Sequence, residues 1–179
     1  MLSSCWRVVQ SLGGFVLYLR HGVTERAQPD REHIDFDDCS TQRNLSEPGR
    51  DQVREIGVAF NSLGIPINKV FSSPFCRCME TAELAFGDYQ VVDELGFSIN
   101  ATSQETVRMA DVLRSMLSIK PQKGNTVLVS HTANLKEATG IWPKPEAVIE
   151  LFRPTAENGV EYYGKLLPQD WHRLLRTLD

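Results

Sequence analysis

Two apolar segments, one near each end of the chain, each end at a histidine. The first covers residues 15–19 and is followed by Arg20 and His21, and the second covers residues 126–129 and is followed after one serine by His131. Both segments have the length and β-rich composition of buried strands. Ligands of open α/β sheets bind beyond the carboxyl ends of strands, so these ends predict a site. A single Arg-His-Gly strand end is equally consistent with solvated surface residues.

A third candidate strand, Lys69–Ser72, ends just before a predicted helix that carries Arg77 in its first turn. The free N–H groups and positive dipole of a helix N-terminus favour an anion, and an arginine there strengthens that preference. In a parallel sheet the three strand ends share one edge, with little opposing charge nearby in sequence. Guanidinium forks match the paired oxygens of a phosphoryl group, and a neutral imidazole is a competent nucleophile near neutral pH. The pattern predicts a phosphate pocket made of Arg20, His21, Arg77 and His131.

The pattern between these segments predicts alternating helices and strands. A helix is expected from the N-cap Ser46 to Gly64, another from Ser73-Pro74 to Gly87, and a third after the capping box at Thr102. Further expected elements are a strand over Tyr89–Leu95, a short helix over Ala133–Thr139, a hairpin of 146–153 and 160–167 around Asn158-Gly159, and a last helix opened by Pro168.

This order of elements predicts an α/β fold. We expect a three-layer sandwich, with a mostly parallel central sheet, helices on both faces and a C-terminal antiparallel hairpin. The chain has 179 residues, which predicts a single domain over 1–179 with its core at about 15–176.

Composition narrows the classes of partner. The chain is 41% hydrophobic and 23% charged with a net charge of -4, which argues against a nucleic-acid or anionic-membrane surface. No apolar run approaches the length of a membrane span. The residues Leu2-Ser3-Ser4-Cys5 resemble the end of a lipoprotein signal, but no apolar stretch precedes them. We expect a cytoplasmic protein on the sequence as given, and an exported or lipid-anchored one if the true start lies upstream.

The cysteines and the segment after the first strand carry two further expectations. Cys5, Cys39, Cys76 and Cys78 lack the usual zinc spacing, and we expect free thiols rather than metal ligands. Residues 23–43 are polar, acidic and without periodicity. Such a long loop either folds over the mouth of the site or is a solvated acidic loop.

Four motifs in this chain resemble those of the histidine phosphatase superfamily, which includes the cofactor-dependent phosphoglycerate mutases. The motifs are Leu19-Arg20-His21-Gly22 followed by Thr24-Glu25, the run from Asn44 to Arg50, Ser72-Ser73-Pro74 leading to Arg77 and Thr81-Ala82, and Val129-Ser130-His131. They occur in the family's order and at its spacing, and cover about Phe15 to Gly140.

The resemblance implies that His21 is the nucleophile and becomes phosphohistidine. It implies that Arg20, Arg77 and His131 bind the phosphoryl group, that Thr24, Asn44 and Thr132 are candidate substrate-binding residues, and that no metal or organic cofactor takes part. One ring nitrogen of His21 must donate a hydrogen bond so that the other can attack, and a nearby backbone carbonyl is the expected acceptor. Water then attacks the phosphoenzyme.

The chain departs from the family at the acid that assists the leaving group. Mutase-like members carry a glutamate two residues past a leucine, where this chain has Phe97 after Leu95. Phytase-like members carry an aspartate after the second histidine, where this chain has Thr132. Glu94 is the favoured substitute, with Asp93 or an acid of the loop at residues 35–38 as alternatives. Otherwise the substrate has a good leaving group.

These observations predict a metal-independent phosphatase that hydrolyses phosphomonoesters through phospho-His21. Its partner is a small phosphorylated substrate or a phosphoprotein. A phosphohistidine protein phosphatase is the second expectation within this class. The alternative from a different class is a non-catalytic phosphate-binding module of the same fold. The oligomeric state does not follow from the sequence.

Overall fold

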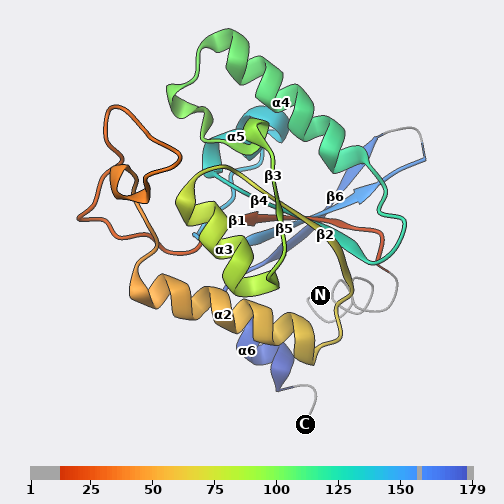
Figure 1. Ribbon diagram of the computed structural model, residues 1–179. Helices are drawn as coiled ribbons and strands as arrows, with labels where there is room; N and C mark the ends of the chain where they lie inside the picture. The colour runs from red at the N-terminus through yellow and green to blue at the C-terminus, as the bar shows by residue number, and fades with distance from the viewer. Residues whose placement is uncertain (1–12, 157–158, 177–179) are drawn as a thin grey trace.

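The computed structural model describes residues 13–156 and 159–176, and its centre is a six-stranded sheet with strand order β3-β2-β4-β1-β5-β6 (Figure 1). The parallel strands are β1 (Val16–Arg20), β2 (Ile67–Ser72), β3 (Gln90–Val91) and β4 (Asn125–Ser130). The antiparallel pair is β5 (Ile149–Pro154), which lies beside β1, and β6 (Val160–Leu166). The predicted α/β class, with a mostly parallel sheet and an antiparallel C-terminal pair, is confirmed. Cys5 and Asn158 lie outside the described residues.

Helices cover both faces of this sheet (Figure 1). One face packs against α2 (Glu47–Ser62), α3 (Cys76–Phe86) and α6 (Asp170–Leu175), and the other against α4 (Ser103–Ser118) and α5 (Thr132–Thr139). Successive side chains of a strand point to opposite faces, so β1 contributes Leu17 and Leu19 to the first core and Val16 and Tyr18 to the second. This double burial explains why β1 is an unbroken apolar run.

The predicted helix starts follow from the local chemistry of their caps. The Ser46 side chain accepts a hydrogen bond from Gly49 N, and Thr102 and Glu105 form both bonds of the capping box. The helix that carries Arg77 begins at Cys76, two residues later than Pro74 suggested. The expected helix starts are therefore confirmed at α2 and α4 and shifted slightly at α3.

The expected strand over Tyr89–Leu95 is mostly wrong. Only Gln90 and Val91 pair with β2, and Val92 N makes one more hydrogen bond to Ser72 O. The chain then turns into a 3₁₀ helix, Asp93–Leu95, which fully buries Leu95 in the core beneath α4. Burial of this leucine outweighs continuation of an exposed edge strand.

The cysteine expectation is also wrong for two residues. Cys39 and Cys76 form a disulfide, with 5.8 Å between their Cα atoms. Local spacing reports only on neighbours in sequence, whereas this pair is separated by 37 residues and brought together by the fold. Cys78 is a free, buried thiol as expected, and burial raises its pKa to about 12.

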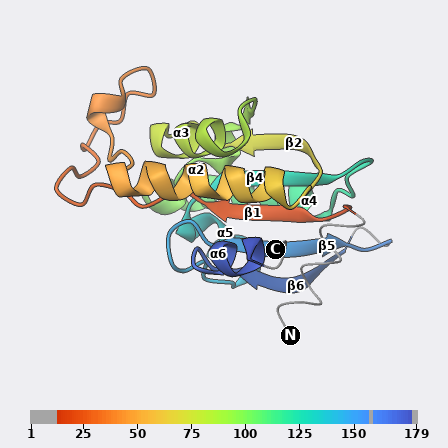
Figure 2. The same ribbon diagram turned by 90° about the horizontal axis from the view of Figure 1, so that it is seen from below.

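The disulfide anchors a segment that we call the strap, residues 30–43. The strap contains one 3₁₀ helix, Cys39–Thr41, and lies beyond the edge of the sheet at which β1 ends (Figure 2). Its anchor, Cys76, is the first residue of α3 and directly precedes Arg77. Residues 31–40 are exposed apart from Ile34, as expected for a solvated loop, whereas Asp30 and residues 41–43 pack at the edge that should hold the site.

Candidate active site

The strand register brings the two histidines together. Arg20 of β1 pairs with Ser130 of β4, so His21 and His131 follow neighbouring strands at the same level. His21 N also donates to Ser130 O at 3.1 Å, and the centroids of the two imidazole rings are 5.5 Å apart. Both side chains are buried. The predicted convergence of the β1 and β4 ends is therefore present.

The backbone fixes the protonation of the His21 ring. Nδ1 of His21 lies 2.9 Å from Gly22 O, and since a carbonyl only accepts, Nδ1 carries the proton and Nε2 keeps its lone pair. Gly22 is held in turn by a hydrogen bond from its N–H to Thr81 Oγ1 at 3.1 Å. A Cβ on Gly22 would lie 2.6 Å from a Val53 methyl, so only glycine lets α2 approach this turn. The arrangement leaves Nε2 of His21 with an unprotonated lone pair.

His131 is held from several sides. Its Nε2 shares a hydrogen bond of 2.8 Å with Ser73 Oγ, and Tyr18 of β1 donates to its carbonyl at 2.6 Å. The rings of Phe75 and Phe97 each lie with their centroids 5.0 Å from the imidazole. Burial raises the pKa of Tyr18, so its hydroxyl stays a donor. These contacts leave His131 little freedom to rotate.

The environment keeps both imidazoles neutral. Burial, followed by the charge of Arg77, lowers the pKa of His21 and of His131 well below the ordinary value of 6.5. The charges of Arg20 and Arg43 lower both pKa values further. A neutral imidazole is the form that can act as a nucleophile, so the positive charge near His21 also keeps that form populated.

We expect both histidines to remain neutral at about pH 6, below the ordinary histidine pKa. Any activity that needs a neutral His21 should be lost as the pH falls through its lowered pKa. Between that value and 6.5 the unfolded chain binds protons that the folded chain does not, so the free energy of unfolding should fall as pH decreases, by at most about 1.4 kcal/mol per pH unit for each histidine. Ring ¹⁵N chemical shifts across a pH titration report the protonation of His21 and His131. Doubly protonated rings at about pH 6 would contradict the prediction.

The charges of three guanidinium groups, those of Arg20, Arg43 and Arg77, act on these rings. Among the described residues, the buried N–H groups at Nε of Arg20, Nε of Arg43, and Nε and Nη2 of Arg77 have no hydrogen-bond partner. Buried donors are almost always paired in folded proteins, and an unpaired one is costly. Four such donors on three adjacent cations are suited to an oxyanion with several acceptor oxygens.

Two carboxylates balance part of this charge, which sequence proximity did not predict. Asp30 of the strap lies 2.9 Å from Nη1 of Arg77, and Glu146 lies 3.8 Å from Nη2 of Arg20. Three guanidinium groups and two carboxylates leave the pocket positive while both histidines are neutral. Asp30 lies 47 residues from Arg77 in sequence, and Glu146 lies in a segment far from both arginines.

Arg43 is the site residue that sequence reasoning missed. It directly precedes the Asn44–Arg50 motif, and this adjacency was the available signal. Its proximity to Arg77, whose Nη1 donates to Arg43 O at 3.2 Å, becomes apparent only when the strap is folded against α3. Its charge acts on His21, His131 and Arg20.

The other predicted residues lie around this centre rather than in it. Thr24 donates to Glu146 at 2.9 Å, which links it indirectly to Arg20. Thr132 begins α5 directly after His131. Glu94 forms an ion pair with Arg108 of α4 at 2.7 Å, a contact directed to that helix.

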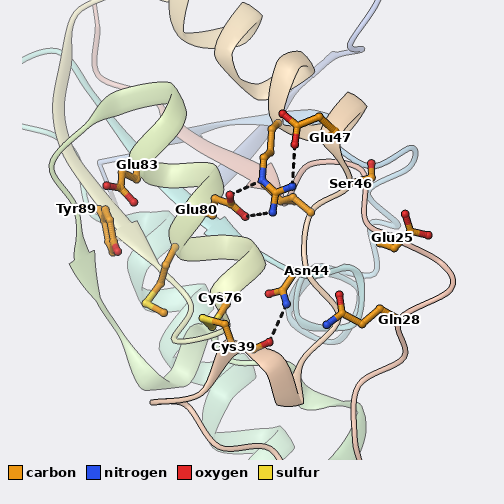
Figure 3. A pocket seen from close by; sticks show the side chains of 13 residues that line it. Glu25, Gln28, Cys39, Asn44, Ser46, Glu47, Cys76, Glu80, Glu83 and Tyr89 are labelled. Carbon is orange, nitrogen blue, oxygen red and sulfur yellow. Dashed lines mark hydrogen bonds and ion pairs between the residues drawn. A yellow bond between two sulfur atoms is a disulfide. The ribbon is translucent and has the colours of Figure 1, made fainter.

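Asn44 belongs to a neighbouring groove between α2 and α3, of about 670 Å³ (Figure 3). Its amide donates to Cys39 O at 2.7 Å, so it supports the strap beside the disulfide. The groove has an acidic lining that includes Glu25, Glu80 and Glu83. Asn44 therefore contacts the segment that carries Arg43 rather than the two histidines.

Phe97 stands where the resemblance to mutase-like proteins led us to expect an acid. Its ring is tilted over His131, and the Arg77 guanidinium carbon lies 5.6 Å from its centroid. Two hydrogen bonds fix the preceding turn, from Ser130 Oγ to Leu95 O and from Asn134 Nδ2 to Gly96 O. An apolar aromatic ring, rather than a carboxylate, therefore contacts His131 and Arg77 here.

In the part of the chain that the structure describes, no group of three or more His, Cys, Asp or Glu side chains is placed to hold a metal ion. Within the same residues, no helix has the length and apolar character needed to cross a membrane.

Comparison with protein families gives a match to the histidine phosphatase superfamily (branch 1) over residues 16–96. Among curated proteins, the mitochondrial serine/threonine-protein phosphatase Pgam5 of Drosophila persimilis is 29% identical over 82 residues, which are 46% of this chain. The Drosophila willistoni protein of the same name is 30% identical over 73 residues. The matched regions span 25% and 22% of the lengths of these two relatives.

Solved structures share the fold over most of the chain. The protein histidine phosphatase SixA complexed with tungstate superposes with a TM-score of 0.60 at 16% identity, covering 87% of this chain and 98% of that one. A phosphoserine phosphatase from Entamoeba histolytica gives a TM-score of 0.60 at 14% identity over the same shares. At these identities the likeness concerns the fold.

Proposed function

Taking the chain as a member of the histidine phosphatase superfamily, we propose that it hydrolyses phosphate monoesters through a phosphohistidine formed on His21. The observation that carries this proposal is the pairing of a neutral His21, with its Nδ1–H bound to Gly22 O, with four unpaired guanidinium donors around it. A nucleophile and an oxyanion pocket are the two parts that phosphoryl transfer requires.

The residues act in two steps. Nε2 of His21 attacks phosphorus while Arg20 and Arg77 neutralise charge on the equatorial oxygens, and the bond from phosphorus to the leaving oxygen breaks. Water then attacks the phosphorus of phospho-His21, the P–N bond breaks, and inorganic phosphate leaves. His131, held by Ser73 beside His21, contributes a hydrogen bond to the same phosphoryl group. The chain's own side chains supply the charge in both steps.

Phe97 affects which leaving groups the proposed phosphatase can release. An alkoxide leaving group gains about 10²- to 10⁴-fold in rate from a positioned acid. Phe97 fills the position of that acid, and Glu94 is paired with Arg108. The proposed phosphatase therefore favours substrates whose leaving group needs little protonation, such as aryl phosphates.

The same observation favours a second candidate substrate, a phosphohistidine side chain of another protein, because its imidazole leaves from phosphorus more readily than an alkoxide. SixA, whose fold this chain shares, is named a protein histidine phosphatase. Pgam5, which matches part of the chain, is named a protein phosphatase for serine and threonine. The proposed substrates are thus small phosphate esters or a phosphoprotein.

Trapping the phosphoenzyme tests the proposal. Rapid quenching during turnover of a chromogenic aryl phosphate should give a phosphorylated protein that is acid-labile and base-stable, as expected for a P–N bond to His21. Peptide mapping under alkaline conditions should place the phosphate on the peptide that contains His21. A label stable to acid would indicate a phosphoester and contradict the proposal.

A leaving-group series separates the alternatives. With the acid position filled by Phe97, kcat/KM should fall steeply from aryl to alkyl phosphates, and a phosphohistidine protein should be cleaved faster than an alkyl phosphate. If kcat/KM hardly changed from aryl to alkyl phosphates, an acid would be protonating the leaving oxygen. Phosphate binding without any phosphoenzyme would identify the non-catalytic phosphate-binding module.

A further inference from the structure

The strap adds a part of the site beyond the two histidines and their flanking arginines. We infer that Arg43 is a third phosphoryl-binding arginine, presented by the disulfide-anchored strap, and that Asp30 of the same strap is the positioning residue for Arg77. This inference rests on the proposed function for the identity of the anion, and it concerns residues that the four family motifs do not include.

The first support is the position of the Arg43 charge. Its charge lowers the pKa of His21, of His131 and of Arg20, and its backbone lies against Arg77, since Arg43 O accepts from Arg77 Nη1 at 3.2 Å. The Nε of Arg43 is buried and has no hydrogen-bond partner. Arg31, in the same strap, is exposed instead. A buried guanidinium donor beside two other cations is costly unless an anion pairs with it.

The second support is the way the strap orients Arg77. Asp30 Oδ1 accepts from Arg77 Nη1 at 2.9 Å, and Arg43 O accepts from the same nitrogen at 3.2 Å. Both bonds engage one end of the guanidinium. Nε and Nη2, which form the edge suited to bidentate binding of two phosphoryl oxygens, remain unpaired. Asp30 therefore sets which edge of Arg77 faces the anion.

Asp30 also positions Arg43. The second donor to its Oδ1 is Arg43 N, at 2.8 Å, so one carboxylate oxygen holds the Arg43 backbone and the Arg77 side chain. The side chain of Asp30 is 20% exposed, whereas that of Arg77 is fully buried. The two arginines are thereby coupled through one aspartate rather than placed independently.

The third support is the anchoring of the strap to α3. The disulfide joins Cys39, four residues before Arg43, to Cys76, one residue before Arg77. The buried side chain of Gln42 adds a hydrogen bond from Cys76 N to its Oε1 at 2.9 Å. One covalent and one polar link therefore fix the Arg43 backbone to the start of α3, which gives the arginine the preorganisation that an oxyanion site needs.

The matching experiment compares Arg43→Gln with Arg31→Gln, a control that removes the same charge from an exposed position of the strap. Two quantities are measured, kcat/KM for an aryl phosphate and the affinity for inorganic phosphate by calorimetry. Arg43→Gln should lower kcat/KM by about 10²-fold, the lower range for loss of one oxyanion donor, and should weaken phosphate binding. Arg31→Gln should leave both near the wild-type values. Arg43→Lys should recover part of the loss, because it restores charge without the fork.

The outcomes separate this inference from the proposed function. His21→Ala should lose turnover but keep phosphate affinity, since the arginines remain. Normal turnover and normal phosphate affinity in Arg43→Gln would overturn the inference while leaving His21 in its role. A wild-type protein that binds phosphate through Arg43 but turns nothing over would overturn the proposed function alone. If Arg43→Gln fails to fold, Arg43→Lys, which keeps the charge, decides by the same two measurements.

Asp30→Asn tests the positioning role. Asparagine keeps an acceptor oxygen for Arg77 Nη1 and Arg43 N but loses the charge, so kcat/KM should fall by about tenfold, the cost of one weakened charge-assisted hydrogen bond. The fall should be the same for aryl and alkyl phosphates, with a matching loss of phosphate affinity. A loss that grows with the pKa of the leaving group, at unchanged phosphate affinity, would instead make Asp30 the missing acid and overturn its positioning role.

Discussion

Replacing His21 with alanine is expected to abolish turnover of any phosphate ester. In the proposed mechanism the imidazole supplies the lone pair at Nε2 that bonds to phosphorus, and the neighbouring imidazole of His131 is engaged by Ser73 through its own Nε2. Loss of a covalent nucleophile costs about 10⁴-fold or more in kcat in enzymes that use one. Steady-state kinetics with an aryl phosphate, together with the absence of a trapped phosphoenzyme, measures the effect.

The matched control is His172→Ala. His172 is exposed on α6, where its ring lies 3.5 Å from Glu55, so its removal deletes an imidazole without touching the pocket. We expect it to retain wild-type kinetics. A His21→Ala protein that turns over substrate at a rate comparable with this control would exclude the phosphohistidine mechanism.

Replacing Arg77 with lysine is the second change with a large expected effect. The guanidinium holds Asp30 and Arg43 O with Nη1 and keeps Nε and Nη2 for the phosphoryl group, whereas one ammonium group cannot serve both directions. The charge is retained, so the loss reports on geometry. We expect kcat/KM to fall by about 10²- to 10³-fold, which corresponds to about 3–4 kcal/mol of transition-state stabilisation.

Arg54→Lys provides the comparison for this variant. Arg54 lies on α2, its side chain is 48% exposed, and its ion pairs with Glu47 and Asp51 are at the surface. Such pairs contribute little, and we expect no change in kinetics. Thermal unfolding of Arg77→Lys shows whether burial of the ammonium has damaged the fold. Near-normal kinetics in a folded Arg77→Lys protein would place Arg77 outside the pocket.

The parts of this molecule that the sequence predicts are those determined by local pattern. The apolar run that ends at Arg20 is buried on both faces of β1. The first polar residues after it therefore lie where the carboxyl ends of the parallel strands meet. Parallel pairing then places His131 beside His21 without any further information. The caps at Ser46 and Thr102 are similarly local, since each is completed within three residues.

The parts that were missed depend on contacts between segments distant in sequence. Local spacing predicts neither the disulfide between Cys39 and Cys76 nor the contact between Arg43 and Arg77, because both depend on where the strap packs. Asp30 reaches Arg77 across 47 residues. The error at Tyr89–Leu95 has the same origin, because burial of Leu95 beneath α4 decided the end of β3. The periodicity of apolar residues predicts single helices and strands, whereas these contacts form between two elements that are distant in sequence.

The disulfide shortens the covalent path between Arg43 and Arg77. Along the backbone 34 residues separate Arg43 from Arg77, but through the sulfur atoms only the few residues next to each cysteine lie between them. A crosslink that closes a loop of this size removes conformational freedom from the unfolded chain corresponding to about 4 kcal/mol. Two of the pocket's three cations therefore stay tethered as neighbours even when the surrounding packing fluctuates. In an environment that keeps thiols reduced, the same two arginines would be held together by hydrogen bonds alone, so the thiol redox state sets how firmly two of the three arginines of the proposed pocket are held.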